Sequence, residues 1–317
     1  MQHTAPFDAG VGESVPTPGS ILCGVRCWIL LALLSGYVGA RAQGPIDGYL
    51  KGRGEADVAV GVSATGASEF IGGDGTRYDL PFSGTLLSAF ATVGVTDGLD
   101  VIASVPFVIT DLNSGLQDAA LFVKGRLLRL PLGDASSADD PQHNLDVLGA
   151  LGVSVPLSDY EVVAAGAIGQ RAQVVQPRLV AQYNRPGFFA STVLGYNYRF
   201  DELDGERLAE IQRTRPGYLP EQPSDYLTGL LRVGLPTRRL YVDAWLEVQR
   251  TLGGRDFVPD VEELPQPYRV DYQQIGGTAY YSEGGKWGLA ASGAAFLGGR
   301  NTSRLWRLSG TVIYLLR

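Results

Sequence analysis

The segment Leu240-Tyr241-Val242-Asp243-Ala244-Trp245-Leu246-Glu247-Val248-Gln249 alternates strictly between two kinds of side chain. Leucine, valine and alanine occupy the even positions, whereas polar and amphipathic side chains occupy the odd positions. A period of two places these two sets on opposite faces of a β-strand. One face therefore suits an apolar environment and the other suits water.

The same alternation recurs along the chain in segments of about ten residues, which is typical of a transmembrane β-barrel. It is clear at 119–127, 188–200 and 227–235, where apolar residues alternate with charged or polar ones. We predict an all-β, antiparallel up-and-down barrel of about twelve strands, with a margin of two. The predicted strands are 54–65, 83–95, 99–108, 116–128, 145–155, 175–184, 188–200, 226–235, 240–250, 270–281, 286–297 and 304–316.

A soluble β-sandwich also alternates, and the lengths of the connections favour the barrel instead. Tight turns are predicted at 96–98, 185–187, 236–239 and 282–285, and the connections between them are mostly long. Outer-membrane barrels have short periplasmic turns and longer outer loops. The connection 129–144 departs from this rule, because it is long although it falls on the side of the short periplasmic turns.

Aromatic residues near the predicted strand ends also favour a membrane protein, since amphipathic rings gather at the membrane interfaces. We predict that they form girdles around the barrel. The residues concerned are Tyr196, Tyr198, Phe200, Tyr226, Trp245, Tyr280, Tyr281, Trp287, Trp306 and Tyr314.

Composition agrees with a β architecture. Glycine fills 42 of the 317 positions, and charged residues make up only 19% of the chain. Helix-forming residues do not gather into long runs with a period of 3.6, so a helical bundle is excluded. The net charge of −7 gives no basic surface for nucleic acid, which we exclude as a partner.

The first 42 residues are predicted to contain a secretory signal peptide. Arg26 precedes an apolar run at 27–34, and Ala40-Arg41-Ala42 offers small residues where signal peptidase cleaves. We expect export with cleavage near Ala42 and one barrel domain over 43–317. Residues 1–24 form an N-terminal extension that does not fit in front of a signal, because it is acidic and contains prolines, and we expect translation to start at Val25 instead. Both cysteines, Cys23 and Cys27, lie in the part that is removed, so no disulfide is expected in the barrel.

Several short motifs resemble those of a known family. They are Ser114-Gly115-Leu116-Gln117-Asp118, Phe122-Val123-Lys124-Gly125-Arg126-Leu127, Leu151-Gly152-Val153-Ser154-Val155-Pro156-Leu157, Gly195-Tyr196-Asn197-Tyr198-Arg199-Phe200 and the stretch Tyr49–Asp57. The chain resembles the meta-pathway phenol-degradation family of outer-membrane proteins. The resemblance implies a transporter barrel of Gram-negative bacteria, with small aromatic or hydrophobic compounds as substrates. The chain departs from the family at Gln117, where glycine is commoner, and in lacking a terminal aromatic residue.

A set of charged residues in the predicted strands falls on the non-lipid face. A basic residue facing lipid at the membrane midplane would cost roughly 2–4 kcal/mol, so these residues should face the lumen. If the lumen is filled with water, these residues set its selectivity. If they instead pair with each other across strands, they plug the barrel. The sequence leaves both alternatives open. The set comprises Lys124, Arg126, Arg178, Arg199, Arg232, Asp243, Glu247 and Arg307, as selectivity residues, and also Asp57, Asp118 and Asp146.

We expect that the protein is not an enzyme and that it has no cofactor and no metal site. His143 lies in the connection 129–144, away from any nucleophile, and the acidic stretch 256–263 lacks the fixed spacing of a calcium loop. Gly72-Gly73-Asp74-Gly75 is predicted to be a turn. The expected function is passive transport of small molecules across the outer membrane, after insertion by the barrel-assembly machinery. The alternative is a closed structural or surface-binding barrel that uses the loops 201–225 and 251–269.

Overall fold

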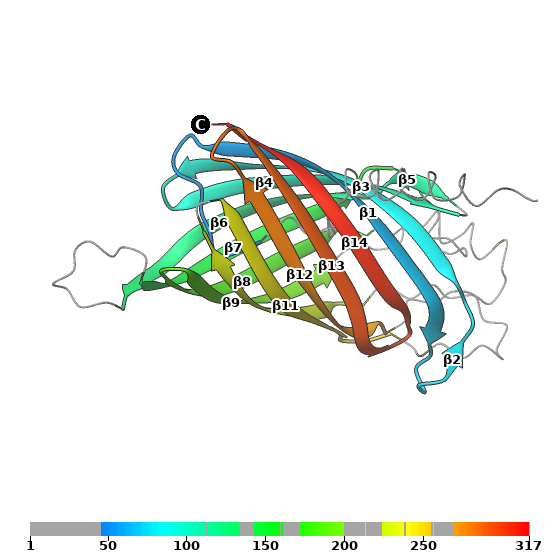
Figure 1. Ribbon diagram of the computed structural model, residues 1–317. Helices are drawn as coiled ribbons and strands as arrows, with labels where there is room; N and C mark the ends of the chain where they lie inside the picture. Colours follow the sequence, from blue (N-terminus) through cyan, green and yellow to red (C-terminus); the bar gives the residue numbers. More distant parts are fainter. Residues whose placement is uncertain are drawn as a thin grey trace, which may run out of the picture. The chain divides into compact units, whose positions relative to one another are not determined.

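The protein is described here from a computed structural model, which covers residues 46–111, 113–132, 143–158, 160, 172–199, 213, 224–237, 239–254, 256 and 269–316. Within these residues, twelve long antiparallel strands form one closed barrel (Figure 1). They are β1 (Ala56–Ile71), β3 (Phe82–Thr96), β4 (Leu99–Thr110), β6 (Asp118–Pro131), β7 (Asn144–Pro156), β8 (Val174–Arg185), β9 (Phe188–Arg199), β10 (Tyr226–Pro236), β11 (Leu240–Thr251), β12 (Asp271–Ser282), β13 (Trp287–Arg300) and β14 (Thr302–Leu316).

Each strand pairs with its neighbour in sequence, and the last strand pairs with the first. The β1–β14 ladder runs from Ala56 opposite Leu316 to Ile71 opposite Thr302. Closure removes the unpaired edges that an open sheet would present, which a strand in lipid cannot tolerate. None of the described residues belongs to a helix that is long and apolar enough to cross a membrane.

All twelve predicted strands are confirmed, with ends that differ by at most a few residues apart from β1, which extends to Ile71. Two short strands were not predicted. β2 (Arg77–Tyr78) pairs with the end of β1, and β5 (Ser114–Leu116) pairs with β4. β5 leads into β6 through Gln117, whose N–H donates to the Pro106 carbonyl at 3.0 Å. The ladder is therefore continued across an irregular residue.

The predicted tight turns are confirmed between β3 and β4, β8 and β9, β10 and β11, and β12 and β13. Gly187 and Gly284 have φ values of 73° and 85°, which favour glycine at these turns. The long connection at 129–144 is shortened, because β6 runs to Pro131 and β7 begins at Asn144. Residues 133–142 of that connection lie outside the described part. We call this end of the barrel the short-turn end and the opposite end the long-loop end.

The predicted turn at 72–75 is also confirmed. The Gly72 N–H donates to the Thr76 carbonyl at 2.8 Å, and Gly75 has a φ of 86°. The Asp74 carboxylate accepts hydrogen bonds from the Thr76 backbone and hydroxyl at 2.9 and 2.6 Å, and these bonds lower the pKa of Asp74. This turn carries no phosphate-binding context.

The outer surface of the barrel is apolar. On β9, β10 and β14, Leu194, Leu231 and Leu308 are 56%, 57% and 62% exposed, while the residues beside them in sequence point inward. These leucine side chains are stable in the hydrocarbon of a membrane, whereas their exposure to water would be unfavourable. The two-residue alternation therefore separates a lipid-facing outside from the lumen, as the sequence predicts.

The girdle prediction holds for only some of its residues. Trp306 and Tyr281 are exposed on the outside, and Trp287 packs against Tyr314 with ring centroids 4.7 Å apart. Tyr196 and Tyr198 share their outward parity with Leu194. The prediction is wrong for Tyr226, Trp245 and Tyr280, which point into the lumen because they share the parity of the inward charged residues. Phe200 lies outside the described residues.

Candidate functional site

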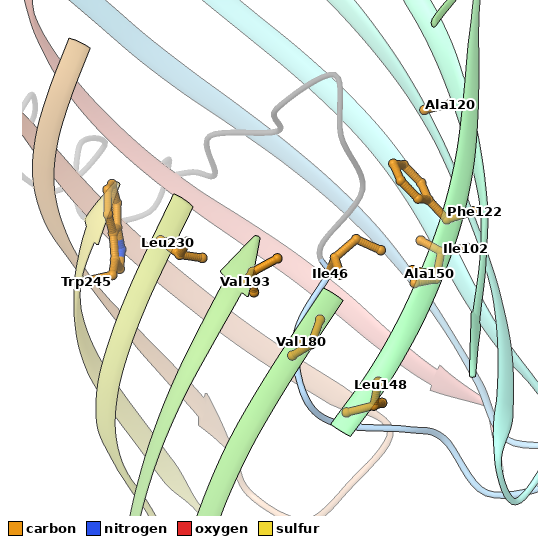
Figure 2. Packing of buried hydrophobic residues seen from close by; sticks show 10 residues of the cluster. All are labelled: Ile46, Ile102, Ala120, Phe122, Leu148, Ala150, Val180, Val193, Leu230 and Trp245. Carbon is orange, nitrogen blue, oxygen red and sulfur yellow. The ribbon is translucent and has the colours of Figure 1, made fainter. Parts of the chain in front are cut away.

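The inner wall of the barrel carries an unexpected stripe of apolar side chains. Leu148, Val180, Val193 and Leu230 lie directly opposite one another on β7, β8, β9 and β10, and all are buried. On the neighbouring strands, Ile102 of β4 lies opposite Phe122 of β6, and both are fully buried. We call these six residues the apolar belt (Figure 2). Alternation alone does not predict it, because a period of two gives the side of the wall but not what that side meets.

The belt is buried because the chain preceding β1 lies against it. Residues 46–52, which we call the N-terminal segment, run inside the barrel, and Ile46 is only 8% exposed within the belt cluster. Figure 2 shows the Ile46 side chain among Val180, Leu148 and Ile102. The sequence gives no signal for this placement, because the segment has no alternation and its partners lie far along the chain.

A buried lysine holds the segment. Lys124 on β6 is 2% exposed, and its ammonium donates to Asp47 Oδ1 at 3.0 Å and to the Tyr49 carbonyl. The same ammonium lies 3.5 Å from Asp100 Oδ2 on β4. A buried ammonium needs such partners, since an unpaired buried charge is strongly destabilising. Lys124 therefore joins the segment to two strands of the wall.

Further contacts fix the rest of the segment. The Lys51 N–H donates to both oxygens of Asp100 at 3.1 and 3.2 Å, and the Lys51 ammonium lies 2.5 Å from Asp57 Oδ2. The Tyr49 and Phe189 rings pack edge to face, with their centroids 5.8 Å apart. Gly48 fits only because it lacks a side chain, since a Cβ there would come within 2.2 Å of Gln182 Oε1.

A cavity of about 580 Å³ remains on the other side of the segment. It is bounded by Ile46, Asp47 and Tyr49 of the segment and by inward residues of β10 to β14. The aromatic side chains Tyr241, Trp245 and Tyr280 contribute to its walls. The lumen is thus neither fully open nor fully filled: one half is covered by the segment and the other half faces a cavity.

Hydroxyl groups cross the wall of the cavity half in a row. Thr278, Ser292, Ser309 and Ser63 lie directly opposite one another on β12, β13, β14 and β1. Ser309 Oγ donates to Ser63 Oγ at 3.2 Å. Asp243 on β11 lies opposite Thr278 and extends the row. We call the four hydroxyl residues the hydroxyl row, which gives this half a wettable wall.

Several of the predicted selectivity residues line or adjoin the cavity. Arg232 Nε lies 3.2 Å from Asp243 Oδ2, and the Tyr241 hydroxyl donates to the same oxygen at 2.7 Å. Arg307 of β14 also lines the cavity. Glu247 is 3% exposed and accepts a hydrogen bond from Gln274. Two more ionised residues on the inner wall form an ion pair, with Arg126 Nε 3.2 Å from Asp146 Oδ1.

Arg178 has a different environment from the cavity residues. β8 and β9 pair on both sides of Pro177, but the ladder is interrupted there, because proline has no N–H. Arg178 Nη1 donates to the Pro177 and Tyr196 carbonyls at 3.1 and 2.9 Å, and Nη2 donates to Gln176 Oε1 and Asn197 Oδ1 at 2.9 and 2.7 Å. Arg178 thus joins the two strands where their backbone bonds are missing.

The remaining predicted residues lie toward strand ends. The Arg199 guanidinium lies 4.8 Å from the centroid of the Tyr226 ring, and Asp118 accepts a hydrogen bond from the Tyr160 hydroxyl. His143 Nε2 lies 3.2 Å from the Tyr183 hydroxyl, just before β7. Of the acidic stretch 256–263, only Asp256 is described, and it pairs with Arg300.

A closed antiparallel barrel with an apolar outside and charged groups inside is the architecture of outer-membrane β-barrel proteins. Comparison with solved structures agrees. The fold is similar to that of an outer membrane channel from Pseudomonas putida F1, with a TM-score of 0.62 and 14% identity over 86% of this chain and 100% of the channel.

Two other similar structures are less closely superimposable. The NanC porin gives a TM-score of 0.48 at 7% identity, covering 82% of this chain and all of the porin. The translocator domain of the autotransporter NalP from Neisseria meningitidis gives 0.43 at 14% identity, covering 94% and 96%. No protein-family model and no curated protein matches the sequence.

Proposed function

We propose that the protein is a passive channel for small molecules in the outer membrane. The observation that carries this proposal is the cavity of about 580 Å³ between the N-terminal segment and β10 to β14. Its walls combine charged residues, three members of the hydroxyl row (Thr278, Ser292 and Ser309) and aromatic side chains. A lumen of this kind gives a small solute a path with hydrogen-bonding partners and without a covalent or energy-coupled step.

The location follows from the same architecture. The apolar outer surface suits the hydrocarbon layer, and a barrel of this type reaches the outer membrane after export and insertion by the assembly machinery. The signal predicted from the sequence, with cleavage near Ala42, supports this route, and it lies outside the described residues. Membrane lipid is then the permanent partner of the outer surface.

The resemblance to the meta-pathway phenol-degradation family supports small aromatic or hydrophobic compounds as substrates. Tyr241, Trp245 and Tyr280 on the cavity wall offer rings on which such compounds can stack. Selectivity among ions and polar solutes is assigned to the charged residues of the lumen. Of the eight predicted selectivity residues, Arg232, Asp243 and Arg307 carry most of it, because these three line the cavity.

Planar-bilayer recording of the purified protein tests the proposal. A salt gradient across the bilayer gives both the conductance and the sign of ion selectivity. We expect steady single-channel conductance from protein that shows the heat-modifiable gel migration of a folded barrel. Absence of conductance from such folded protein would contradict the channel and would favour a closed, surface-binding barrel.

A further inference from the structure

We infer that the N-terminal segment is an inner wall that sets the size limit of the channel. This inference rests on the proposed channel function and goes beyond it by naming the element that selects solutes by size. The segment borders the cavity through Ile46, Asp47, Tyr49 and Lys51. The width of the passage therefore depends on where this segment sits, in addition to the barrel diameter.

The way the segment is attached distinguishes it from the barrel strands. Each of the twelve long strands is held by a ladder on both sides, whereas residues 46–52 belong to none of the ladders of the described sheet. The contacts of the segment are separate ones: the Lys124 ammonium, the Asp100 carboxylate, the Asp57 carboxylate and the Ile46 seat in the apolar belt. Its position is thus fixed by a few side chains, and changing one of them changes the passage without breaking the sheet.

The junction with β1 is built as a turn. Gly54 has a φ of 80°, and its N–H donates to the Gly94 carbonyl at 2.8 Å. Gly94 lies so close to the segment that a Cβ there would come within 2.2 Å of the Gly52 carbonyl oxygen. The chain therefore reverses tightly at the short-turn end and enters the lumen from that end.

Removing the segment takes Lys51 away from Asp57, but one charge pair of the barrel wall does not depend on the segment. Lys124 and Asp100 lie 3.5 Å apart on neighbouring strands, so they retain each other when Asp47 is absent. The apolar belt, by contrast, would be exposed to water, and this keeps the segment seated in the intact protein. The segment is consequently a fixed wall under ordinary conditions, and its removal leaves a barrel that can still close.

Liposome swelling with uncharged sugars of increasing size tests the inference. The probes are arabinose, glucose, sucrose and raffinose, and the proteins are the full chain, the full chain lacking residues 46–52, and Lys124→Met. Lys286→Met is the matched control, because Lys286 is an exposed lysine in the turn between β12 and β13. We expect the deletion to raise the rate for sucrose relative to arabinose by about tenfold, Lys124→Met to give a smaller rise, and the control to give none.

The outcomes separate the two proposals. An unchanged size limit in the deletion variant would overturn the inner wall and leave the channel intact. Failure of both the full chain and the deletion variant to admit arabinose would overturn both proposals.

A labelling measurement covers the case in which the deletion variant does not fold. Ile46→Cys is placed in a chain whose Cys23 and Cys27 are serine, and a membrane-impermeant maleimide is the probe. Because Ile46 is buried in the belt, we expect slow labelling that Lys124→Met accelerates about tenfold. Equal labelling rates with and without Lys124 would overturn the role of the lysine in fixing the wall.

Discussion

The two halves of the lumen are built from the same kind of strand but meet different surroundings. In the segment half, β4 and β6 to β9, the inward row Leu148–Val180–Val193 is apolar and covered by residues 46–52. In the cavity half, β10 to β14 with β1 and β3, the corresponding row Thr278–Ser292–Ser309 is hydroxylic and faces the cavity. Inward parity therefore does not mean contact with water. What each inward residue does depends on whether the segment covers it.

The largest difference between the halves should appear when an arginine is removed from each. Arg178→Ala leaves two strand carbonyls and two amide side chains without their charged donor, so we expect a loss of about 3 kcal/mol in the free energy of unfolding. Arg232→Ala, beside the cavity, should cost less, about 1–2 kcal/mol, because the Tyr241 hydroxyl still donates to Asp243 and the cavity next to it admits water. Urea unfolding in lipid vesicles measures both values. Equal losses would mean that Arg178 has no special role in joining β8 and β9.

A pair of nearly isosteric exchanges tests the halves next. Val180→Thr places a hydroxyl without a partner in the apolar belt, and we expect it to cost about 1–2 kcal/mol. Thr311→Val, on the cavity wall, should change the free energy of unfolding by less than about 0.5 kcal/mol, because the Thr311 hydroxyl has no hydrogen-bond partner among the described residues. The same urea titration compares them. A costly Thr311→Val with a harmless Val180→Thr would reverse the assignment of the dry and wet halves.

Charge reversal beside the cavity should alter ion selectivity. A unit charge about 4 Å from an ion in water is worth about 1 kcal/mol, so we expect Arg232→Glu or Arg307→Glu to raise the cation-to-anion permeability ratio about fivefold. Arg199→Glu should have a smaller effect, because Arg199 lies against Tyr226 at the long-loop end and is not part of the cavity wall. Reversal potentials in a salt gradient give these ratios. Unchanged reversal potentials for both cavity variants would place the ion path elsewhere.

The smallest effect is expected in the hydroxyl row. Ser309→Ala removes one hydrogen bond, to Ser63, and should cost less than about 1 kcal/mol. The neighbouring hydroxyls and water should keep the wall wettable, so the conductance should stay close to that of the unchanged protein. Bilayer recording and urea unfolding on the same preparation check both expectations. A large fall in conductance would show that this single hydroxyl is part of the solute path.

The barrel could be predicted from the sequence because its strands carry their own signal. The alternation at 240–249 gives both the strand and its inward side, and the buried Asp243 and exposed Val242 agree with it. The tight turns, marked by glycine or proline, indicate that the strands they join are antiparallel neighbours. Parity alone also places Trp245 and Tyr280 in the lumen, so the girdle prediction is wrong for these two residues, whose position near strand ends does not decide the side they face.

The arrangement inside the lumen could not be predicted in the same way. Lys124 contacts Asp47, which lies 77 residues earlier in the sequence, and also Asp100. No local sequence pattern predicts such a pairing. The N-terminal segment has neither alternation nor a helical period, so its seat in the belt follows only from tertiary packing. Pro177 was a usable signal, since a proline inside a strand indicates a missing ladder bond, and Arg178 beside it is the natural donor to fill that place.

Chemical modification of the two halves during bilayer recording is the most direct test of a passive channel that runs through the cavity half. Ser292→Cys lies on the cavity wall and Ala150→Cys lies on β7 within the cluster covered by Ile46, each in a chain whose Cys23 and Cys27 are serine. With a bulky maleimide, we expect modification at position 292 to lower the conductance by about half or more and modification at position 150 to leave it unchanged. An unchanged conductance at position 292, or equal block at both positions, would contradict a passive channel that runs through the cavity half.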